Sequence, residues 1–114
     1  MSNLLTTLRG HRFNFDTEAE LQDAIEKVLK ESGLYYAREV RLGEKDRIDF
    51  LLGPVGIEVK TDSPTNAVLR QLHRYAQYVL IAELVLITNR AKHLSIPRQI
   101  GGKPVTVIFT GSPF

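Results

Sequence analysis

The spacing of hydrophobic residues along the chain predicts a helix near its beginning. Over residues 15–33 apolar side chains recur every three or four positions, which is typical of a helix with one buried stripe. Thr17 and Glu20 have the spacing of a capping box at the start of this helix, and Gly33 ends it. The residues predicted to form the buried stripe are Leu21, Ala24, Ile25 and Val28.

A second helical pattern covers residues 61–80. Ser63 is predicted to be its N-cap, with Pro64 at the first helical position, where the missing N–H costs nothing. The periodicity places Val68, Leu72 and Val79 on the buried side of this helix.

The remaining apolar stretches are short and rich in β-branched residues, which predicts strands. Two of them flank a Gly53–Gly56 turn and form a hairpin, and another, at 83–89, is apolar almost throughout, as a strand buried on both faces is. The predicted strands are residues 34–42, 47–52, 57–60, 83–89 and 105–111. The predicted order α-β-β-β-α-β-β indicates an α/β fold with a mixed central sheet flanked by helices.

Length and composition limit the alternatives. The 114 residues predict one domain, with residues 1–12 as a loose or docked N-terminal arm. The chain has no cysteine, which excludes disulfides and thiolate zinc sites. No apolar run approaches the length of a membrane span or the core of a signal peptide, so we expect a cytoplasmic protein without a membrane partner. A net charge of +2 permits a polyanionic partner but is too small to indicate one.

The predicted hairpin carries charges within its strands instead of in its turn. Folding residues 47–60 about Pro54 places Asp49 across from Glu58, because opposed residues pair symmetrically around the turn. Directly opposed carboxylates destabilise a sheet, and more so where the face is partly buried. A divalent cation removes this cost, and carboxylate oxygens with waters suit Mg²⁺ or Mn²⁺. Lys60, on the same face as Glu58, would then stabilise the charge that develops when a phosphodiester is hydrolysed.

These residues carry a family resemblance. Asp49, eight intervening residues and then Glu58-Val59-Lys60 resemble the D…(D/E)xK motif of the PD-(D/E)XK nuclease superfamily. Ile48 stands where the motif has proline. The resemblance implies a restriction-endonuclease-like αβββαβ core, with Asp49 and Glu58 as metal ligands joined by the Val59 carbonyl. It also implies that Lys60 orients the attacking water.

Two further features resemble members of this superfamily. Gln71 and Tyr75 match the QxxxY motif of its recombination-nuclease and resolvase-like branches, which implies that Gln71 reaches toward the metal and Lys60. Many members add an acid from the first helix. We choose Glu18, because Glu20 is already employed in the capping box, and keep Glu20 as the alternative. The stretch from Glu18 to Ile25 also resembles the opening of small virus-type replication-repair nucleases.

Other polar residues are candidates for the same site or for contact with its substrate. Asp46 is the alternative to Asp49 as the first acid of the motif. It is less suitable, because it lies in the polar turn and its position along the strand would point its side chain to the opposite face. The candidates to contact nucleic acid are Arg47, Arg70, Arg74 and Tyr75. The basic stretch at 90–103 could follow phosphates or be a solvated loop.

The sequence therefore predicts a Mg²⁺- or Mn²⁺-dependent deoxyribonuclease. Little of the chain remains for reading bases, so we expect structure-selective or non-specific cleavage of DNA. The resemblance implies a repair or Holliday-junction-resolvase type of enzyme that works as a homodimer. The alternative is a catalytically silent nucleic-acid-binding or assembly module that keeps the fold.

Overall fold

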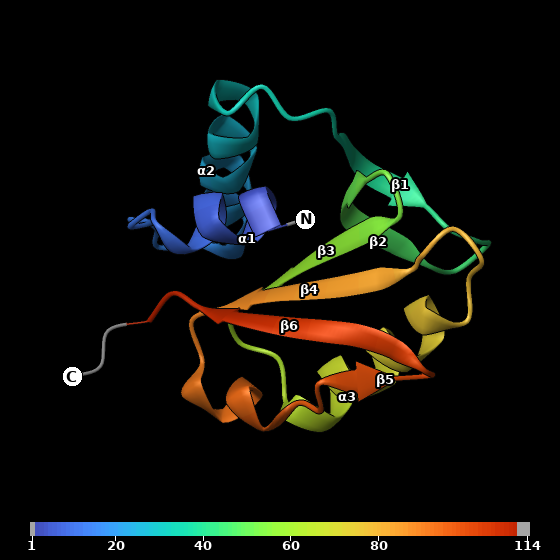
Figure 1. Cartoon of the computed structure of the whole chain (residues 1–114). Helices are drawn as coiled ribbons and strands as arrows, with labels where there is room; N and C mark the ends of the chain where they lie inside the picture. The colour runs from blue at the N-terminus through green and yellow to red at the C-terminus, as the bar shows by residue number, and fades with distance from the viewer. Residues whose placement is uncertain (1, 112–114) are drawn as a thin grey trace.

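An open sheet of six strands separates two layers of helices in the computed structural model, which describes residues 2–111 (Figure 1). In chain order the elements are α1 (Ser2–Arg9), α2 (Glu18–Glu31), β1 (Ala37–Arg41), β2 (Arg47–Leu52), β3 (Val55–Lys60), α3 (Thr65–Ala76), β4 (Glu83–Thr88), the 3₁₀ helix η1 (Ala91–Ser95), β5 (Gln99–Ile100) and β6 (Lys103–Phe109). The predicted α/β class and mixed sheet are confirmed.

The sheet combines an antiparallel and a parallel half. Its spatial order is β1-β2-β3-β4-β6-β5, and β1, β2 and β3 follow one another as an antiparallel meander. The crossover through α3 makes β4 parallel to β3, and β6 lies parallel to β4 on the other side. The two central strands, β3 and β4, are buried along nearly their whole length, as the apolar sequence of β4 predicts.

The two faces of the sheet bury two hydrophobic cores. On one face α1 and α2 cover the strands, and on the other α3 and η1 do so (Figure 1). Alternate residues of β4 serve the two cores, with Val85 and Ile87 in the first and Leu84 and Leu86 in the second. This alternation fixes the register of β4, and the register in turn fixes where the polar residues of β3 lie along the sheet.

The N-terminal arm is docked, and it is helical. Leu4 and Leu8, four positions apart, are buried in the core that α1 shares with α2. Five of the eight residues of α1 are polar, and the helix is short, so it depends on this contact more than on its own propensity.

Helix α3 is shorter at both ends than its sequence pattern predicts. Pro64, not Ser63, is its N-cap, and the carbonyl of Pro64 accepts the N–H groups of Ala67 and Val68. The helix ends at Ala76, so Val79 lies beyond it and is 99% exposed, and its predicted burial is wrong. The cause is tertiary, because Ile81 is buried against the sheet and the chain has to leave the helix to reach β4.

The hairpin turn is tighter than predicted. Only Gly53 and Pro54 connect β2 to β3, with Gly53 at a φ of 55° that Pro54 could not adopt. Gly56, expected in the turn, lies inside β3. A Cβ there would overlap Ile48 Cδ1 and come within 3.0 Å of Ile81 Cδ1, so a larger residue fits only if these two buried side chains shift.

Gly56→Ala is expected to lower the free energy of unfolding by about 1–3 kcal/mol, as overpacking of a core does. Urea unfolding measures the change. Ile48→Val removes the Cδ1 atom that the new methyl group would meet, so the double variant should recover part of the loss. Purely additive effects of the two substitutions would show that the Ile48 side chain does not cause the overpacking.

Candidate active site

The hairpin brings Asp49 and Glu58 together as the sequence predicts. The backbone ladder between β2 and β3 ends where Phe50 pairs with Ile57, and Asp49 and Glu58 are the next residues of the two strands. At this step side chains replace part of the backbone ladder. The Asp49 N–H donates to Glu58 Oε1 at 3.2 Å, and the Val59 N–H donates to Asp49 Oδ2 at 2.8 Å. Each carboxylate is therefore anchored to the other strand.

Lys60 completes the polar end of β3. Its Nζ lies 3.3 Å from Glu58 Oε2, and its side chain is 17% exposed, against 3% for that of Glu58. The lysine is thus the more solvent-facing member of a largely buried ion pair. An ammonium at the rim of two carboxylates can meet an anionic group that approaches from solvent.

The two carboxylates share a site where their negative charges are costly. Burial raises the pKa of Glu58 to about 8, and the charge of Asp49 adds to the rise, while Lys60 opposes it. Burial also raises the pKa of Asp49 above its ordinary value. The Val59 N–H and the charge of Lys60 act against that rise, and the charge of Glu18 adds to it. Carboxyl groups whose pKa is raised by burial and by a neighbouring carboxylate are a common property of functional sites.

Tyr75 connects α3 to this cluster. Its hydroxyl lies 3.2 Å from Glu58 Oε2 and 3.0 Å from the Arg47 carbonyl, and it accepts a hydrogen bond of 2.7 Å from Gln71 Nε2. The resemblance implied that Gln71 itself reaches the cluster. In the structure Gln71 contacts Tyr75, and Tyr75 contacts Glu58. The expectation that Tyr75 contacts nucleic acid is wrong, because the side chain is fully buried.

The two acids of α2 have separate positions. Thr17 Oγ1 accepts the Glu20 N–H and lies 3.1 Å from Glu20 Oε1, so the capping arrangement is present. Glu18 Oε1 accepts the N–H of Thr61, the residue after Lys60, at 3.1 Å. The structure thus brings Glu18, and not Glu20, to the end of β3 where the other carboxylates lie.

The loop that follows Lys60 is held by residues of the second half of the chain. Arg90 donates from Nε to the Thr61 carbonyl at 2.6 Å and from Nη2 to Asp62 at 2.8 Å. Buried His93 bonds Thr88 through Nδ1 and the Ser63 carbonyl through Nε2. Since a carbonyl only accepts, Nε2 carries the hydrogen there. The sequence pattern places Arg90 and His93 in a basic stretch and gives no sign of this contact, because nothing local indicates a partner about 30 positions away.

The arginines predicted to contact nucleic acid differ in their surroundings. Arg70 is exposed on α3, and Arg47 is exposed with Nη1 3.9 Å from Glu39 Oε2. Arg74 instead pairs with buried Asp46 at 3.0 Å. The rival acid Asp46 is thereby engaged in a separate cluster. Burial raises its pKa, but the hydrogen bonds from Arg74 and Tyr78 outweigh that effect and hold it below its ordinary value.

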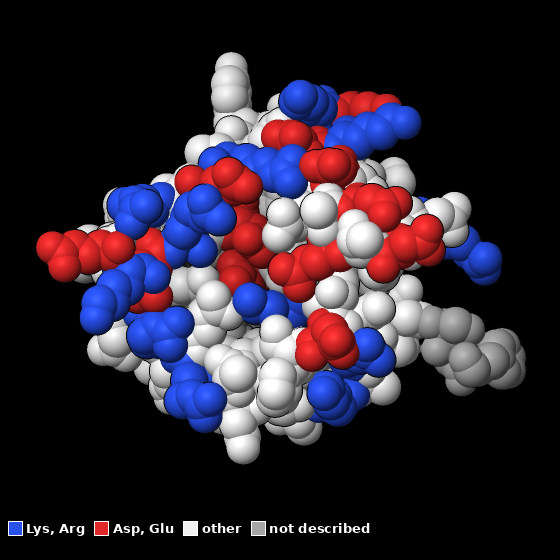
Figure 2. Space-filling view, turned by 180° about the vertical axis from the view of Figure 1, so that it is seen from behind, with Lys and Arg blue, Asp and Glu red and all other residues white. Residues whose placement is uncertain are grey.

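One face of the molecule carries charges of both signs. On the face seen in Figure 2, basic side chains are interleaved with acidic ones instead of forming a uniform patch. Pairing of opposite charges also occurs at Arg38, which forms ion pairs with Asp23 and Glu26 of α2. An approaching polyanion would therefore be guided by local contacts more than by an overall field.

The donors at this site fit a hard divalent cation that keeps part of its water. Asp49 Oδ1 and Glu18 Oε2 accept no hydrogen bond within residues 2–111, which leaves each free for a cation. Over that same range, no three acidic or imidazole side chains lie close enough together to hold a metal ion, so Glu18 stands apart from the pair Asp49 and Glu58. Mg²⁺ is commonly held by one or two carboxylates and waters, so this open arrangement suits it better than a site built for full protein ligation.

Comparisons with known proteins gave no match to a family model, to a curated protein or to a solved structure. Among the described residues, no helix has the length and apolar character needed to cross a membrane. The residues of the chain itself therefore carry the functional proposal.

Proposed function

We propose that this chain is a Mg²⁺- or Mn²⁺-dependent nuclease that hydrolyses DNA phosphodiester bonds, with a restriction-endonuclease-like αβββαβ core. The observation that carries the proposal is the pair Asp49 and Glu58, opposed on adjacent strands at raised pKa, with Lys60 Nζ 3.3 Å from Glu58. A structural sheet gains nothing from placing a half-buried carboxylate beside a buried one, whereas a cation-binding site requires such a pair.

The residues have distinct roles in this proposal. Asp49 and Glu58 would hold the metal with the Val59 carbonyl, and Glu18 would join through the carboxylate oxygen that Thr61 leaves free. The metal, when bound, supplies a polarised water and offsets the charge that develops on the phosphoryl oxygens. Lys60 donates toward the same oxygens from the solvent side and orients the attacking water.

Tyr75 and Gln71 position Glu58 from behind. Glu58 Oε2 is bonded by Tyr75, and Gln71 fixes the tyrosine, so the carboxylate is held at both oxygens before any ligand arrives. This kind of support keeps ligands in a productive geometry. It also gives the Gln71–Tyr75 pair a function without contact to the substrate.

DNA is the proposed substrate, because the resemblance points to it. The core uses nearly the whole chain and leaves no further element to enter a groove, so we propose structure-selective or non-specific cleavage. Exposed Arg70 and Arg47 are the proposed contacts to phosphates. A homodimer would present two such sites to two strands, and sedimentation at micromolar concentration tests for it.

The decisive experiment is a cleavage assay on branched, flapped, nicked, single-stranded and linear DNA with Mg²⁺ or Mn²⁺. We expect cleavage of at least one substrate and its loss in EDTA and in Asp49→Asn, a nearly isosteric change that removes the charge. Glu31→Gln, an exposed acid at the end of α2, is the control and should cut normally. Equal cleavage by the Asp49 variant and the parent would overturn the assignment.

The second candidate is a module that keeps the fold and binds nucleic acid without cutting it. The observation that favours it is that Glu18 is bonded to Thr61 and does not form a three-carboxylate metal site with Asp49 and Glu58 among the described residues. That version predicts no cleavage of any DNA in the panel, with binding that is equal with and without Mn²⁺.

A further inference from the structure

The outer edge of β6 is open along most of its length. β5 is only two residues long and pairs with β6 at Lys103 and Pro104. Beyond that pairing, in the part of the chain that the structure describes, no strand lies against this edge of β6. An unpaired strand edge offers N–H and C=O groups to any extended chain.

The direction of these backbone groups follows from one hydrogen bond. The Val105 N–H donates to the Arg98 carbonyl, on the side away from β4. Because backbone groups point to alternate sides along a strand, Val107 and Phe109 also point away from β4. The Thr110 N–H points to the opposite side and donates to the carbonyl of Thr88, the last residue of β4. Val107 and Phe109 therefore each present one donor and one acceptor along the open edge.

Two connected hollows follow this edge. The first has a volume of about 370 Å³ and lies between the end of α1 and the segment from η1 to β5. Its lining residues are Arg9, Leu94, Ile96, Arg98, Val105, Thr106 and Val107. The second, of about 160 Å³, shares Arg9 and Val107 with it and continues to Thr110. Together they make a groove along the strand from Val105 to Thr110, which we call the β6 groove.

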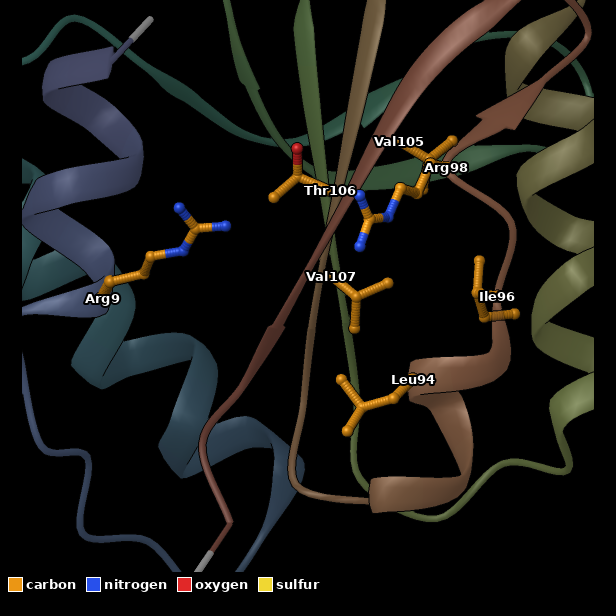
Figure 3. Close-up of a pocket in the computed structure, with 7 residues that line it drawn as sticks. All are labelled: Arg9, Leu94, Ile96, Arg98, Val105, Thr106 and Val107. Atoms are coloured by element: carbon orange, nitrogen blue, oxygen red, sulfur yellow. The ribbon is translucent and has the colours of Figure 1, made fainter.

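The charge of the β6 groove selects an acidic occupant. Arg9 and Arg98 reach over β6 toward one another from opposite walls (Figure 3), and neither forms an ion pair within residues 2–111. No Asp or Glu lines either hollow, and the side chain of His11 adds to the second. The rest of the lining combines Thr106 and Thr110 with apolar side chains, including Leu94, which is 54% exposed.

We propose that the β6 groove binds an extended, acidic peptide segment of a partner protein, which adds a strand to the sheet. The backbone of such a peptide would bond Val107 and Phe109, while its acidic side chains would pair with Arg9 and Arg98. A second copy of this chain, related by a two-fold axis on the same edge, would bring these arginines against their own copies. A nucleic acid would use the guanidinium groups but not the outward backbone groups or the apolar wall. The proposal is independent of the metal site.

A displayed library of random octapeptides, selected on the immobilised protein without metal, tests the proposal. We expect acidic peptides to be enriched over basic ones by roughly tenfold, which corresponds to one or two charge-assisted pairs. The double variant Arg9→Glu/Arg98→Glu should reverse this preference, and Lys92→Glu, an exposed residue of η1 outside the lining, should leave it unchanged.

Val107→Pro removes one outward N–H and leaves the pairing with β4 in place, as proline at an edge strand does. Val107→Pro should abolish the enrichment of acidic peptides. If the Val107→Pro protein does not fold, the variant Arg9→Glu/Arg98→Glu still tests the proposal. No enrichment on the parent protein, or the same enrichment on both variants, would overturn the proposal. Two other results would also overturn it. One is a dimer of the parent protein that Val107→Pro dissociates. The other is binding of single-stranded DNA that is lost in the double arginine variant but kept in Val107→Pro.

Discussion

Glu58→Gln is expected to stabilise the metal-free protein at alkaline pH while it eliminates binding of Mn²⁺. The folded protein raises the pKa of Glu58 from 4.5 to about 8 through burial and the charge of Asp49. Between these two values the folded state keeps a proton that the unfolded chain has released, so stability falls as the pH rises through this window. Above pH 8 the full cost is present, on the order of 5 kcal/mol for a rise from 4.5 to about 8.

Glutamine carries no charge, so Glu58→Gln should escape that cost. Its free energy of unfolding should match the parent near pH 4.5 and exceed it progressively up to pH 8 and above. Urea unfolding at a series of pH values in EDTA measures the difference, with Glu31→Gln as the exposed control. A parent protein whose stability is flat from pH 5 to 9 would show that ionisation of Glu58 costs the folded state nothing.

Cation binding should stabilise only the parent protein. Mn²⁺ binds the ionised pair and therefore stabilises the folded parent by mass action, about 2.7 kcal/mol at a hundred times the dissociation constant. The Glu58→Gln protein should show no such gain, and calorimetric titration should detect no binding. A variant that is more stable than the parent and yet inactive is the result expected of a site that the fold maintains at a cost.

Lys60→Met is expected to separate cation binding from catalysis. Methionine keeps much of the aliphatic side chain but removes the ammonium 3.3 Å from Glu58 Oε2. The carboxylates remain, so Mn²⁺ should still bind, whereas the rate of DNA cleavage should fall by about 10²–10³, the usual effect of removing one donor at a developing charge. Single-turnover cleavage at saturating metal measures it.

The control for Lys60 is Lys27→Met, which removes a lysine of α2 that is remote in sequence from the hairpin. The Lys27→Met protein should cleave DNA at the parental rate. Loss of Mn²⁺ binding in Lys60→Met would show that the lysine maintains the site and does not act on the substrate. Cleavage at the parental rate would remove Lys60 from the proposed mechanism altogether.

The local patterns of the sequence predicted most of the architecture. Period and capping residues located α2, and alternation located β2. Alternation places Ile48 and Phe50 on one face of β2, but the structure buries them in different cores. The symmetric pairing of a short hairpin was enough to oppose Asp49 to Glu58. These features depend on residues within about a dozen positions of one another, which is the range over which a sequence pattern is informative.

The features that sequence patterns did not predict depend on distant contacts. The end of α3 is set by the burial of Ile81, and the need for glycine at position 56 is set by Ile48 and Ile81 together. The same holds at the site. Gln71 approaches Glu58 through the hydroxyl of Tyr75, which no spacing rule predicts, since it depends on how α3 lies across the sheet. Tertiary packing decided each of these outcomes.

The hydroxyl of Tyr75 gives the protein an internal optical reporter. It has one hydrogen and two acceptors, the Arg47 carbonyl and Glu58, so its hydrogen bonding changes with the ionisation of the carboxyl group. The chain contains four tyrosines and no tryptophan, so near-ultraviolet signals come largely from tyrosine. The near-ultraviolet circular dichroism of the unlabelled protein should therefore follow the occupancy of the site, and the spectrum of Tyr75→Phe supplies the baseline.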